Sequence, residues 1–287
     1  MLYVLRSVFL KYFENGKCIE IADIEDFNLD QTFNCGQCFR WNKLEDNSFV
    51  GIAFGKEIKL LRQNNSIIIN NMSLAEFEKL WLNYFDLNTD YCKIKNDLSS
   101  LDSILKTAAD FAPGIRILNQ DPWETLCSFI ISQNNNIPRI KLIIKRLCEN
   151  FGNKIGDDAF SFPSVKIISS LTENDLIPIK CGFRARYIID AAKKVNCNFI
   201  DFSTLKSAPL DEARKMLMQI TGVGPKVAEC TLLYGFHRLD AFPLDVWMKR
   251  AMEVLFPGKK FDFFGKYAGI AQQYIFHYSR MNPHLFD

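Results

Sequence analysis

A lysine and an aspartate flank a glycine-containing turn in the C-terminal third of the chain. Lys226 directly follows the segment Thr221-Gly-Val-Gly-Pro225, and Asp245 ends the segment Phe242-Pro-Leu-Asp245. Glycine permits positive φ and proline suits the first turn of a helix, so residues 221–225 predict a tight hairpin between two helices. Because a helix N-terminus binds anions, the expected ligand of this hairpin is a phosphate. An amine and a carboxylate beside it indicate chemistry on a nucleotide sugar.

Lys226 and Asp245 would have different roles in the reaction. An amine attacks a sugar carbon only when it is neutral, and free lysine has a pKa of about 10.4, so such a site must favour the neutral amine through burial and neighbouring cations. A nearby carboxylate has the opposite effect. We therefore assign Asp245 mainly to stabilising positive charge that develops on the sugar, with proton transfer second. The alternative, that Asp245 caps the following helix, is compatible with this role.

Composition describes an ordinary globular protein. The chain has 287 residues, of which 48% are hydrophobic and 24% charged, and this length favours one or two domains. A net charge of +2 is too small to indicate nucleic-acid binding by itself. Any DNA-binding surface must therefore be local, as in the basic pairs at 184–186, 193–194 and 249–250.

The nine cysteines are odd in number and scattered along the chain. The first residues carry charges within an apolar run, which is unlike a secretion signal or a membrane span. We therefore expect an intracellular protein in a reducing environment. Cys35 and Cys38 form a lone CxxC pair without two further ligands at matching spacing, so we interpret them as free thiols rather than a zinc site.

Short apolar and β-branched runs separated by turn residues predict an antiparallel sheet in the first seventy residues. Helical patterns follow, and we predict an α+β fold. The predicted strands cover residues 38–42, 49–54, 57–61 and 66–70. The predicted helices cover residues 74–84, 91–98, 101–111, 121–131, 136 or 137 to 151, 184–194, 211–220, 226–236, 245–255 and 261–280. We expect a sheet domain over 1–104 and a helical region over 105–287, with lobes of about 134–224 and of 105–133 plus 225–287.

The hairpin, with Lys226 and the downstream Asp245, resembles the helix-hairpin-helix superfamily of DNA glycosylases. In the bifunctional members the lysine is the nucleophile, so the resemblance implies a Schiff base with the sugar and a lyase step. Some relatives carry four cysteines after the aspartate for an iron–sulfur cluster. No cysteine follows Cys230, and we expect no such cluster and no organic cofactor.

The hexapeptide Gly36-Gln-Cys-Phe-Arg-Trp41 resembles a segment specific to 8-oxoguanine DNA glycosylases, which usually have serine at the place of Cys38. The resemblance implies that the Gly36 carbonyl accepts the N7 hydrogen that 8-oxoguanine has and guanine lacks. Guanine would place an unpaired acceptor there, at a cost of roughly 1–3 kcal/mol. Without the resemblance, the glycine would indicate only a turn.

Two further segments match the DNA-contacting surface of the family. The resemblance implies that Asn134 fills the gap left by the extruded base and that Arg139 contacts the estranged cytosine. Phe183, often tyrosine in the family, would wedge beside that base, and Arg184 would hydrogen-bond to it. The alternatives are a polar turn between helices and ordinary surface charge. The hairpin glycines, Gly222 and Gly224, would bind the DNA backbone.

The last long helix would supply the base pocket. Gln272 and Phe276 lie four residues apart and share one helix face. The resemblance implies that Phe276 stacks on the flipped base, that Gln272 bonds its Watson–Crick edge, and that Cys230 forms the opposite wall. Alternatively, Phe276 and Cys230 are core residues.

Family members also bind a monovalent cation at the hairpin, which here would use the carbonyls of Met218, Ile220 and Val223. Two positions depart from the family pattern. Trp247 stands where mammalian members have a phosphate-contacting histidine, and Ser279 stands where they have its aspartate partner. This puts the local phosphate contact in doubt.

The sequence therefore predicts a monomeric enzyme that removes 8-oxoguanine from duplex DNA and nicks the abasic site. One alternative is a glycosylase for alkylated bases, which would need neither Lys226 nor the Gly36 segment. A second is a non-enzymatic module that uses the hairpin only to bind phosphates. Cleavage assays on the different lesions discriminate among the three.

Overall fold

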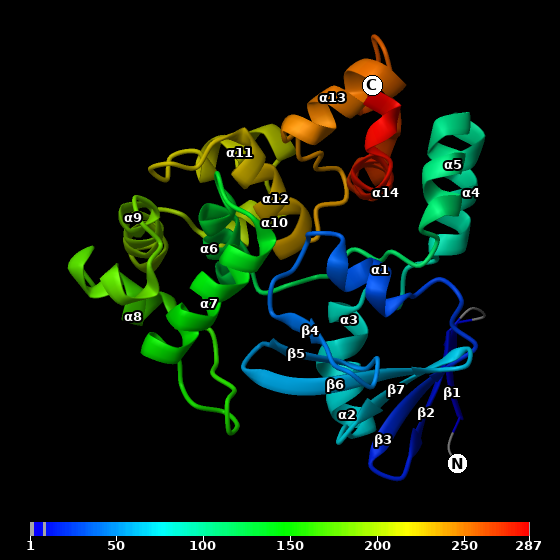
Figure 1. The fold of residues 1–287 in the computed structure, drawn as a ribbon, viewed down its shortest axis with the longest axis horizontal. Coiled ribbons are helices and arrows are strands. Elements are labelled where there is room, and N and C mark those ends of the chain that lie inside the picture. Colours follow the sequence, from blue (N-terminus) through cyan, green and yellow to red (C-terminus); the bar gives the residue numbers. More distant parts are fainter. Residues whose placement is uncertain (1–2, 8–9, 287) are drawn as a thin grey trace. The chain divides into compact units, whose positions relative to one another are not determined.

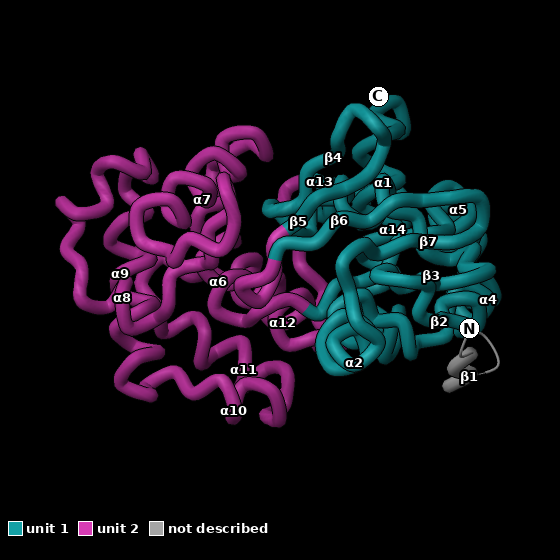
Figure 2. Tube along the Cα trace, turned by 90° about the horizontal axis from the view of Figure 1, so that it is seen from below, with its two compact units in different colours: residues 1–51, 57–119, 247–287 teal, residues 52–56, 120–246 magenta. Residues whose placement is uncertain are grey.

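The computed structural model describes residues 3–7 and 10–286. The chain forms two compact units, which Figure 2 shows in different colours. Unit 1 comprises residues 1–51, 57–119 and 247–287, and unit 2 comprises residues 52–56 and 120–246. Each unit is therefore assembled from segments that are distant in sequence.

Unit 1 is built on a seven-stranded sheet (Figure 1). The strand order is β1-β2-β3-β7-β6-β5-β4, and β1–β2, β2–β3, β3–β7, β6–β7 and β4–β5 pair antiparallel. The strands are β1 Tyr3–Ser7, β2 Leu10–Asn15, β3 Cys18–Ala22, β4 Trp41–Lys43, β5 Phe49–Ala53, β6 Lys56–Gln63 and β7 Ser66–Asn70. The predicted antiparallel sheet is confirmed, although the first three strands were not assigned from the sequence.

A two-residue turn, Gly16-Lys17, joins β2 to β3, because Asn15 pairs with Cys18. Gly16 has φ 64°, and glycine at the first position of such a turn supplies the positive φ that the hairpin requires. The hairpin places β3 beside β7, where Ile19 pairs with Ile69 and Ile21 with Ile67. All four isoleucine side chains are buried, so the centre of the sheet contributes the core of this unit.

A helix over residues 74–84 packs its aromatic side chains on the sheet. It comprises α2 Leu74–Glu76, a π-helical turn Phe77–Trp81 and α3 Leu82–Tyr84. The Tyr12 and Phe77 rings lie 5.0 Å apart, and Trp41 Nε1 donates a 2.8 Å hydrogen bond to the Tyr84 hydroxyl. The helix predicted for this stretch is therefore present, with a π-helical turn in its middle.

The other helices of unit 1 include α5 and α14, which pack side by side (Figure 1). They are α1 Leu29–Asn34, α4 Tyr91–Leu101, α5 Ser103–Phe111, a 3₁₀ segment Phe261–Tyr267, α14 Ala268–Met281 and a 3₁₀ turn Pro283–Phe286. The prediction of one helix over 261–280 was wrong, because Gly265 has φ 63° and ψ −149° and breaks it. Asp102 separates α4 from α5 in extended conformation, and its carboxylate caps α5.

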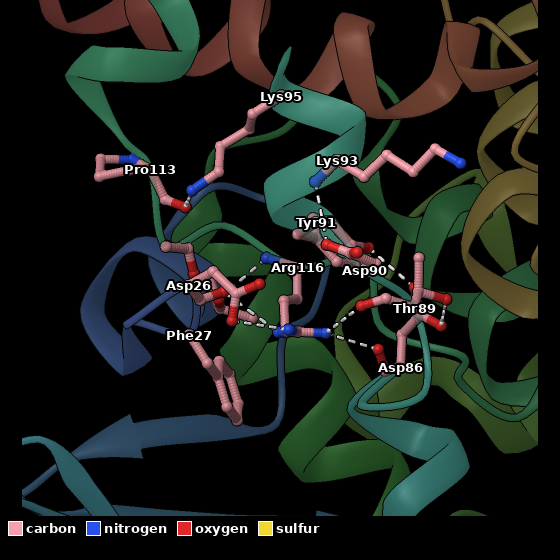
Figure 3. Close-up of polar contacts among 12 residues, drawn as sticks. Asp26, Phe27, Asp86, Thr89, Asp90, Tyr91, Lys93, Lys95, Pro113 and Arg116 are labelled. Carbon is pink, nitrogen blue, oxygen red and sulfur yellow. Dashed lines mark hydrogen bonds and ion pairs between the residues drawn. The ribbon is translucent and has the colours of Figure 1, made fainter. Parts of the chain in front are cut away.

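Arg116 ties three segments of unit 1 together, as Figure 3 shows. Its side chain is 1% exposed and forms an ion pair with Asp26 at 2.8 Å. It also donates to the carbonyls of Asp86 at 2.6 Å and Thr89 at 3.3 Å, and its guanidinium lies 4.5 Å from the centre of the Tyr91 ring. A planar fork of donors suits such a set of acceptors.

Unit 2 is mainly helical. Its helices are α6 Pro122–Ser132, α7 Ile137–Phe151, α8 Val165–Ser169, a 3₁₀ segment Asn174–Ile179, α9 Arg184–Asn196, α10 Phe202–Ser207, α11 Leu210–Leu217 and α12 Pro225–Gly235. Helix α13 Val246–Leu255 starts at the last residue of unit 2 and otherwise belongs to unit 1. Helices α6 and α12 pack closely, because Gly235 lets the Pro122 backbone approach and Phe129 stacks on Tyr234 at 5.4 Å. The predicted α+β class is confirmed, and the shorter helices α1, α8 and α10 were missed.

Within the described part of the chain, no helix is both long enough and apolar enough to cross a membrane.

Candidate active site

The predicted hairpin joins α11 to α12 and depends on one of its two glycines. Gly222 has φ 78°, and a Cβ there would lie 2.4 Å from the Tyr187 ring, so both the conformation and the space require glycine. Gly224, at φ −98° and ψ −177°, precedes α12 in extended conformation. Of the two glycines, only Gly222 adopts the positive φ that glycine permits. Pro225 occupies the first turn of α12, as predicted.

Helix α9 holds the hairpin through a carboxylate that the sequence did not single out and an amine that belongs to the basic pair at 193–194. The Asp190 carboxylate accepts from the Thr221 backbone N–H at 2.7 Å and from Lys194 Nζ at 2.9 Å. Lys194 Nζ also donates to the Gln219 carbonyl at 2.6 Å. These bonds fix the backbone of the turn while leaving the N-terminus of α12 available for an anion.

Lys226 lies in the first turn of α12 and is half-buried. Its Nζ donates a 3.2 Å hydrogen bond to the Ser132 hydroxyl and lies 5.0 Å from the centre of the Phe129 ring. Both partners belong to α6. The packing of α6 on α12 therefore directs the amine, and the aromatic face next to it limits its hydration.

A buried carboxylate positions the loop that carries Asp245. Glu229, on α12, accepts from the Arg214 guanidinium with one oxygen and from the Phe242 backbone N–H at 2.8 Å with the other. Phe242 begins the Phe-Pro-Leu-Asp segment that ends at Asp245, which is half-buried. Sequence reasoning missed Glu229 and Arg214, because no local pattern marks a carboxylate whose partners lie on other elements.

Cys230 lies one turn after Lys226 and is fully buried. Burial raises the pKa of its thiol to about 11, with the Lys226 ammonium lowering that pKa and the Asp245 carboxylate raising it. The charges of both predicted catalytic side chains therefore affect the pKa of this thiol. The thiol is buried and uncharged at neutral pH, which is compatible both with the predicted wall of a base pocket and with an ordinary core cysteine.

Thiol labelling should distinguish the buried Cys230 from the exposed cysteines. At neutral pH, iodoacetamide should modify the exposed Cys92 and Cys197 first, whereas Cys230 should stay unmodified because only a thiolate reacts and burial holds its pKa near 11. Mass spectrometry of digested samples gives the order of modification. Denatured protein, in which all nine cysteines are accessible, is the control. Alkylation of Cys230 as fast as Cys92 would contradict the buried position.

The asparagine-rich turn between α6 and α7 is built around Arg184. Arg184 is 3% exposed, and its guanidinium donates to the carbonyls of Gln133 and Asn134 and, at 3.2 Å, to that of Cys181. In this structure the arginine predicted to contact a DNA base thus also supports the turn. Asn136 caps α7, because its side chain accepts from the Arg139 N–H at 3.0 Å.

Three of the predicted DNA contacts are exposed on unit 2. Asn134 is exposed with φ 50°, at the tip of the turn. Arg139 is exposed in the first turn of α7. Phe183 is 50% exposed and its ring makes an edge contact with Tyr187 at 5.7 Å. A large exposed aromatic ring next to polar groups is suited to stacking against a base.

The second group of predicted site residues lies in unit 1. Gly36 has φ 89°, and a Cβ built on it would lie 3.6 Å from Phe276 Cε1 and 3.8 Å from an Arg280 nitrogen. Phe276, four residues after Gln272 on α14, is half-buried. The structure therefore brings Gly36 and Phe276 together, although they are distant in sequence.

Gln272 is buried, and its Oε1 has no hydrogen-bond partner within the described residues. An unpaired buried acceptor costs about 1–3 kcal/mol unless a ligand donates to it. This acceptor is therefore a candidate contact for a ligand.

The carbonyls predicted to bind a cation lie in the hairpin. The Ile220 carbonyl accepts from the Val223 N–H at 3.0 Å, which leaves its second lone pair. Over residues 3–7 and 10–286, no group of three or more His, Cys, Asp or Glu side chains is arranged to hold a metal ion.

The two departures from the family pattern lie in unit 1. Trp247 makes an edge contact with Phe286 at 6.3 Å. Ser279 is fully buried on α14, and its hydroxyl has no partner in the described part of the chain.

Two family models match this chain in succession. The N-terminal domain of 8-oxoguanine DNA glycosylase matches residues 20–126. The HhH-GPD superfamily of base excision DNA repair proteins matches residues 127–262. Together they cover the Gly36 segment, the asparagine turn, the hairpin and Asp245.

Known proteins are similar over most of the chain. The Saccharomyces cerevisiae N-glycosylase/DNA lyase is 34% identical over 251 residues, which are 77% of this chain and 66% of the yeast protein. The structure of MBOgg1 with a low-affinity DNA ligand has a TM-score of 0.90 and 42% identity, covering 99% of this chain and 100% of that one. The Clostridium acetobutylicum 8-oxoguanine glycosylase/lyase, in complex with double-stranded DNA containing cytosine opposite 8-oxoG, has a TM-score of 0.89 and 38% identity, covering 95% and 98%.

Proposed function

This chain belongs to the 8-oxoguanine DNA glycosylase family, and from that premise we propose that it removes 8-oxoguanine from duplex DNA and cleaves the strand at the resulting abasic site. The observation that carries the proposal is Lys226, held in the first turn of α12 beside the phosphate-binding hairpin. The alkylated-base alternative needs neither this amine nor the Gly36 segment, and both are present. We place the enzyme with the DNA of the cell.

Lys226 is the proposed nucleophile. Its Nζ forms a bond to the sugar C1′ while the bond from C1′ to the base nitrogen breaks, and the base leaves with that electron pair and takes up a proton. Loss of the amine protons and opening of the sugar ring give a Schiff base. Removal of a C2′ proton then expels the 3′ phosphate by β-elimination. The Ser132 hydroxyl, which accepts from Nζ, directs the amine during the attack.

Asp245 is the proposed electrostatic partner of this step. Positive charge grows on the sugar as the base leaves, and a fixed carboxylate stabilises it without reorganisation. Glu229 and Arg214 support this role, because they anchor the start of the loop that carries Asp245. Cys230, which is buried and uncharged, forms part of the wall around the base in this proposal.

Base recognition is assigned to unit 1. We propose that the Gly36 carbonyl accepts the N7 hydrogen of 8-oxoguanine and that Phe276 stacks on the flipped base. Gln272 would contact the Watson–Crick edge, and its unpaired Oε1 supports this assignment. Stacking and these bonds offset the few kcal/mol that base flipping costs.

The contacts to the rest of the duplex are assigned to unit 2. We propose that Asn134 fills the vacated position, that Phe183 wedges beside the estranged base and that Arg139 bonds to it. Arg184 makes four hydrogen bonds to the carbonyls of residues 133, 134 and 181, and its fifth N–H, on Nη1, would serve the same base. Gly222 and Gly224 let the hairpin backbone approach a phosphate.

We also propose that the carbonyls of Met218, Ile220 and Val223 hold a monovalent cation beside that phosphate. The fit rests on the Ile220 carbonyl, which uses one lone pair for the Val223 N–H and keeps the other. Such an ion would supply positive charge near the DNA backbone.

Cleavage of defined duplexes tests the proposed function. Duplexes with 8-oxoguanine opposite cytosine should be nicked, and borohydride should trap a covalent complex, because it reduces a Schiff base. The same duplexes with each of the other three opposite bases measure the preference for cytosine. Duplexes with alkylated bases are the comparison. Excision of the alkylated bases alone would favour the alternative enzyme, and absence of any cleavage would favour a DNA-binding module.

A further inference from the structure

The orientation of one peptide group decides what the Gly36 position recognises. If the Gly36 carbonyl faces the base, it accepts the N7 hydrogen of 8-oxoguanine. If the peptide between residues 36 and 37 flips, the Gln37 N–H faces the base instead and suits the N7 acceptor of guanine. Glycine has a small conformational barrier to such a change, so its neighbours must hold the backbone.

Gln273 anchors the residue before Gly36. Its Nε2 donates a 3.1 Å hydrogen bond to the Cys35 carbonyl, and both residues are 1% exposed. Gln273 is adjacent to Gln272 on α14, but its amide contacts protein backbone. Because the Cys35 carbonyl belongs to the peptide that enters Gly36, this bond fixes one side of the glycine.

Gln37 anchors the residue after Gly36. Its fully buried side chain donates from Nε2 to the carbonyls of Thr32 at 2.9 Å and Arg116 at 2.8 Å. Its Oε1 accepts from the Leu118 N–H at 2.9 Å. The Arg116 backbone is itself immobilised, because its side chain is bound by three residues, Asp26, Asp86 and Thr89 (Figure 3).

We propose that Gln273 is a positioning residue for base discrimination: with Gln37, it holds the Gly36 carbonyl in the orientation that accepts from oxidised guanine and rejects guanine. This inference rests on the proposed function and adds the residues that enforce its specificity. Within residues 3–7 and 10–286, no hydrogen bond to the Gly36 carbonyl itself is found, so its direction depends on these neighbours.

The hydrogen bond from the Gln273 amide, and not the volume of its side chain, is what orients the backbone at Gly36. A methionine would fill nearly the same volume without donating to the Cys35 carbonyl. The buried carbonyl would then lack a partner, and rotation of the backbone around Gly36 would relieve that cost. A role in packing alone predicts that methionine is an adequate substitute.

The test compares Gln273→Met with the unaltered protein in three assays. These are single-turnover excision of 8-oxoguanine opposite cytosine, strand cleavage at a preformed abasic site, and the ratio of Kd for guanine-containing to 8-oxoguanine-containing duplex. We expect excision to slow by about tenfold and the Kd ratio to fall by about tenfold, since one buried hydrogen bond is lost. Cleavage of the preformed abasic site should not change, because no base is recognised.

Tyr274→Phe is the matched control. Tyr274 is the next residue on α14, is equally buried, and its hydroxyl has no partner in the described part of the chain, so all three measures should stay unchanged. If Gln273→Met does not fold, Gln273→Asn shortens the donor and serves in its place.

The outcomes are distinguishable. Unchanged discrimination in the variant, or an equal loss in the excision and abasic-site assays, overturns the inference and leaves the proposed function intact. Failure of the unaltered protein to excise 8-oxoguanine overturns the proposed function itself. A fall in discrimination with intact abasic-site cleavage supports Gln273 as the positioning residue.

Discussion

Lys226→Gln protein should form no borohydride-trapped complex with 8-oxoguanine duplex, and its cleavage rate should fall on the order of 10⁴-fold. An amide nitrogen does not attack C1′, and it cannot form a Schiff base. Gel electrophoresis of labelled duplex after reduction measures both the trapped complex and the nicked strand. The effect is large because the amine takes part in every covalent step of the proposed reaction.

The loss should be chemical and not structural. Lys226 is half-buried, and its described contacts are one hydrogen bond to Ser132 and one aromatic face, so glutamine should leave the thermal midpoint nearly unchanged. Lys215→Gln is a control of equal charge change, since Lys215 is exposed on the neighbouring α11. That variant should be trapped normally. Trapping of Lys226→Gln at the normal yield would show that another amine is the nucleophile.

The parts of the fold that the sequence predicted are those with local signals. Helices α6 and α7 begin close to their predicted starts at residue 121 and at residue 136 or 137, where Asp121 and Asn136 cap them. The hairpin was likewise predictable, because Pro225 and the two glycines are adjacent. Such features depend on the few residues that form them, so they can be read without the rest of the chain.

Partners far apart in sequence could not be predicted in this way. Arg116 bonds to Asp26 across 90 residues, and Gln273 bonds to Cys35 across 238. The partners of Glu229 in unit 2 could not be predicted either, because they lie on α11 and in the Asp245 loop. The sequence therefore indicated candidate reactive groups through family motifs, whereas the side chains that orient those groups emerged only from the packed structure.

Arg116→Met should destabilise unit 1 by about 3–5 kcal/mol, which is the usual cost of removing one partner from a buried ion pair. Methionine fills much of the volume but donates nothing. It leaves the Asp26 carboxylate without its partner and the carbonyls of Asp86 and Thr89 without this donor (Figure 3). Urea unfolding followed by tryptophan fluorescence measures the change, because Trp41 and Trp81 are buried in this unit.

One further variant separates charge from geometry, and a second serves as a control. Arg116→Lys keeps the positive charge but replaces the planar fork by a point charge, so it should recover only part of the lost stability. Lys95→Met removes an exposed hydrogen bond to the Pro113 carbonyl in the same region and should cost less than about 1 kcal/mol. If Arg116→Met costs no more than Lys95→Met, the buried cation is not what joins the three segments. The Arg116 carbonyl also accepts from the Gln37 side chain, so the cation that joins these segments lies in the same hydrogen-bonded network as the residue after Gly36.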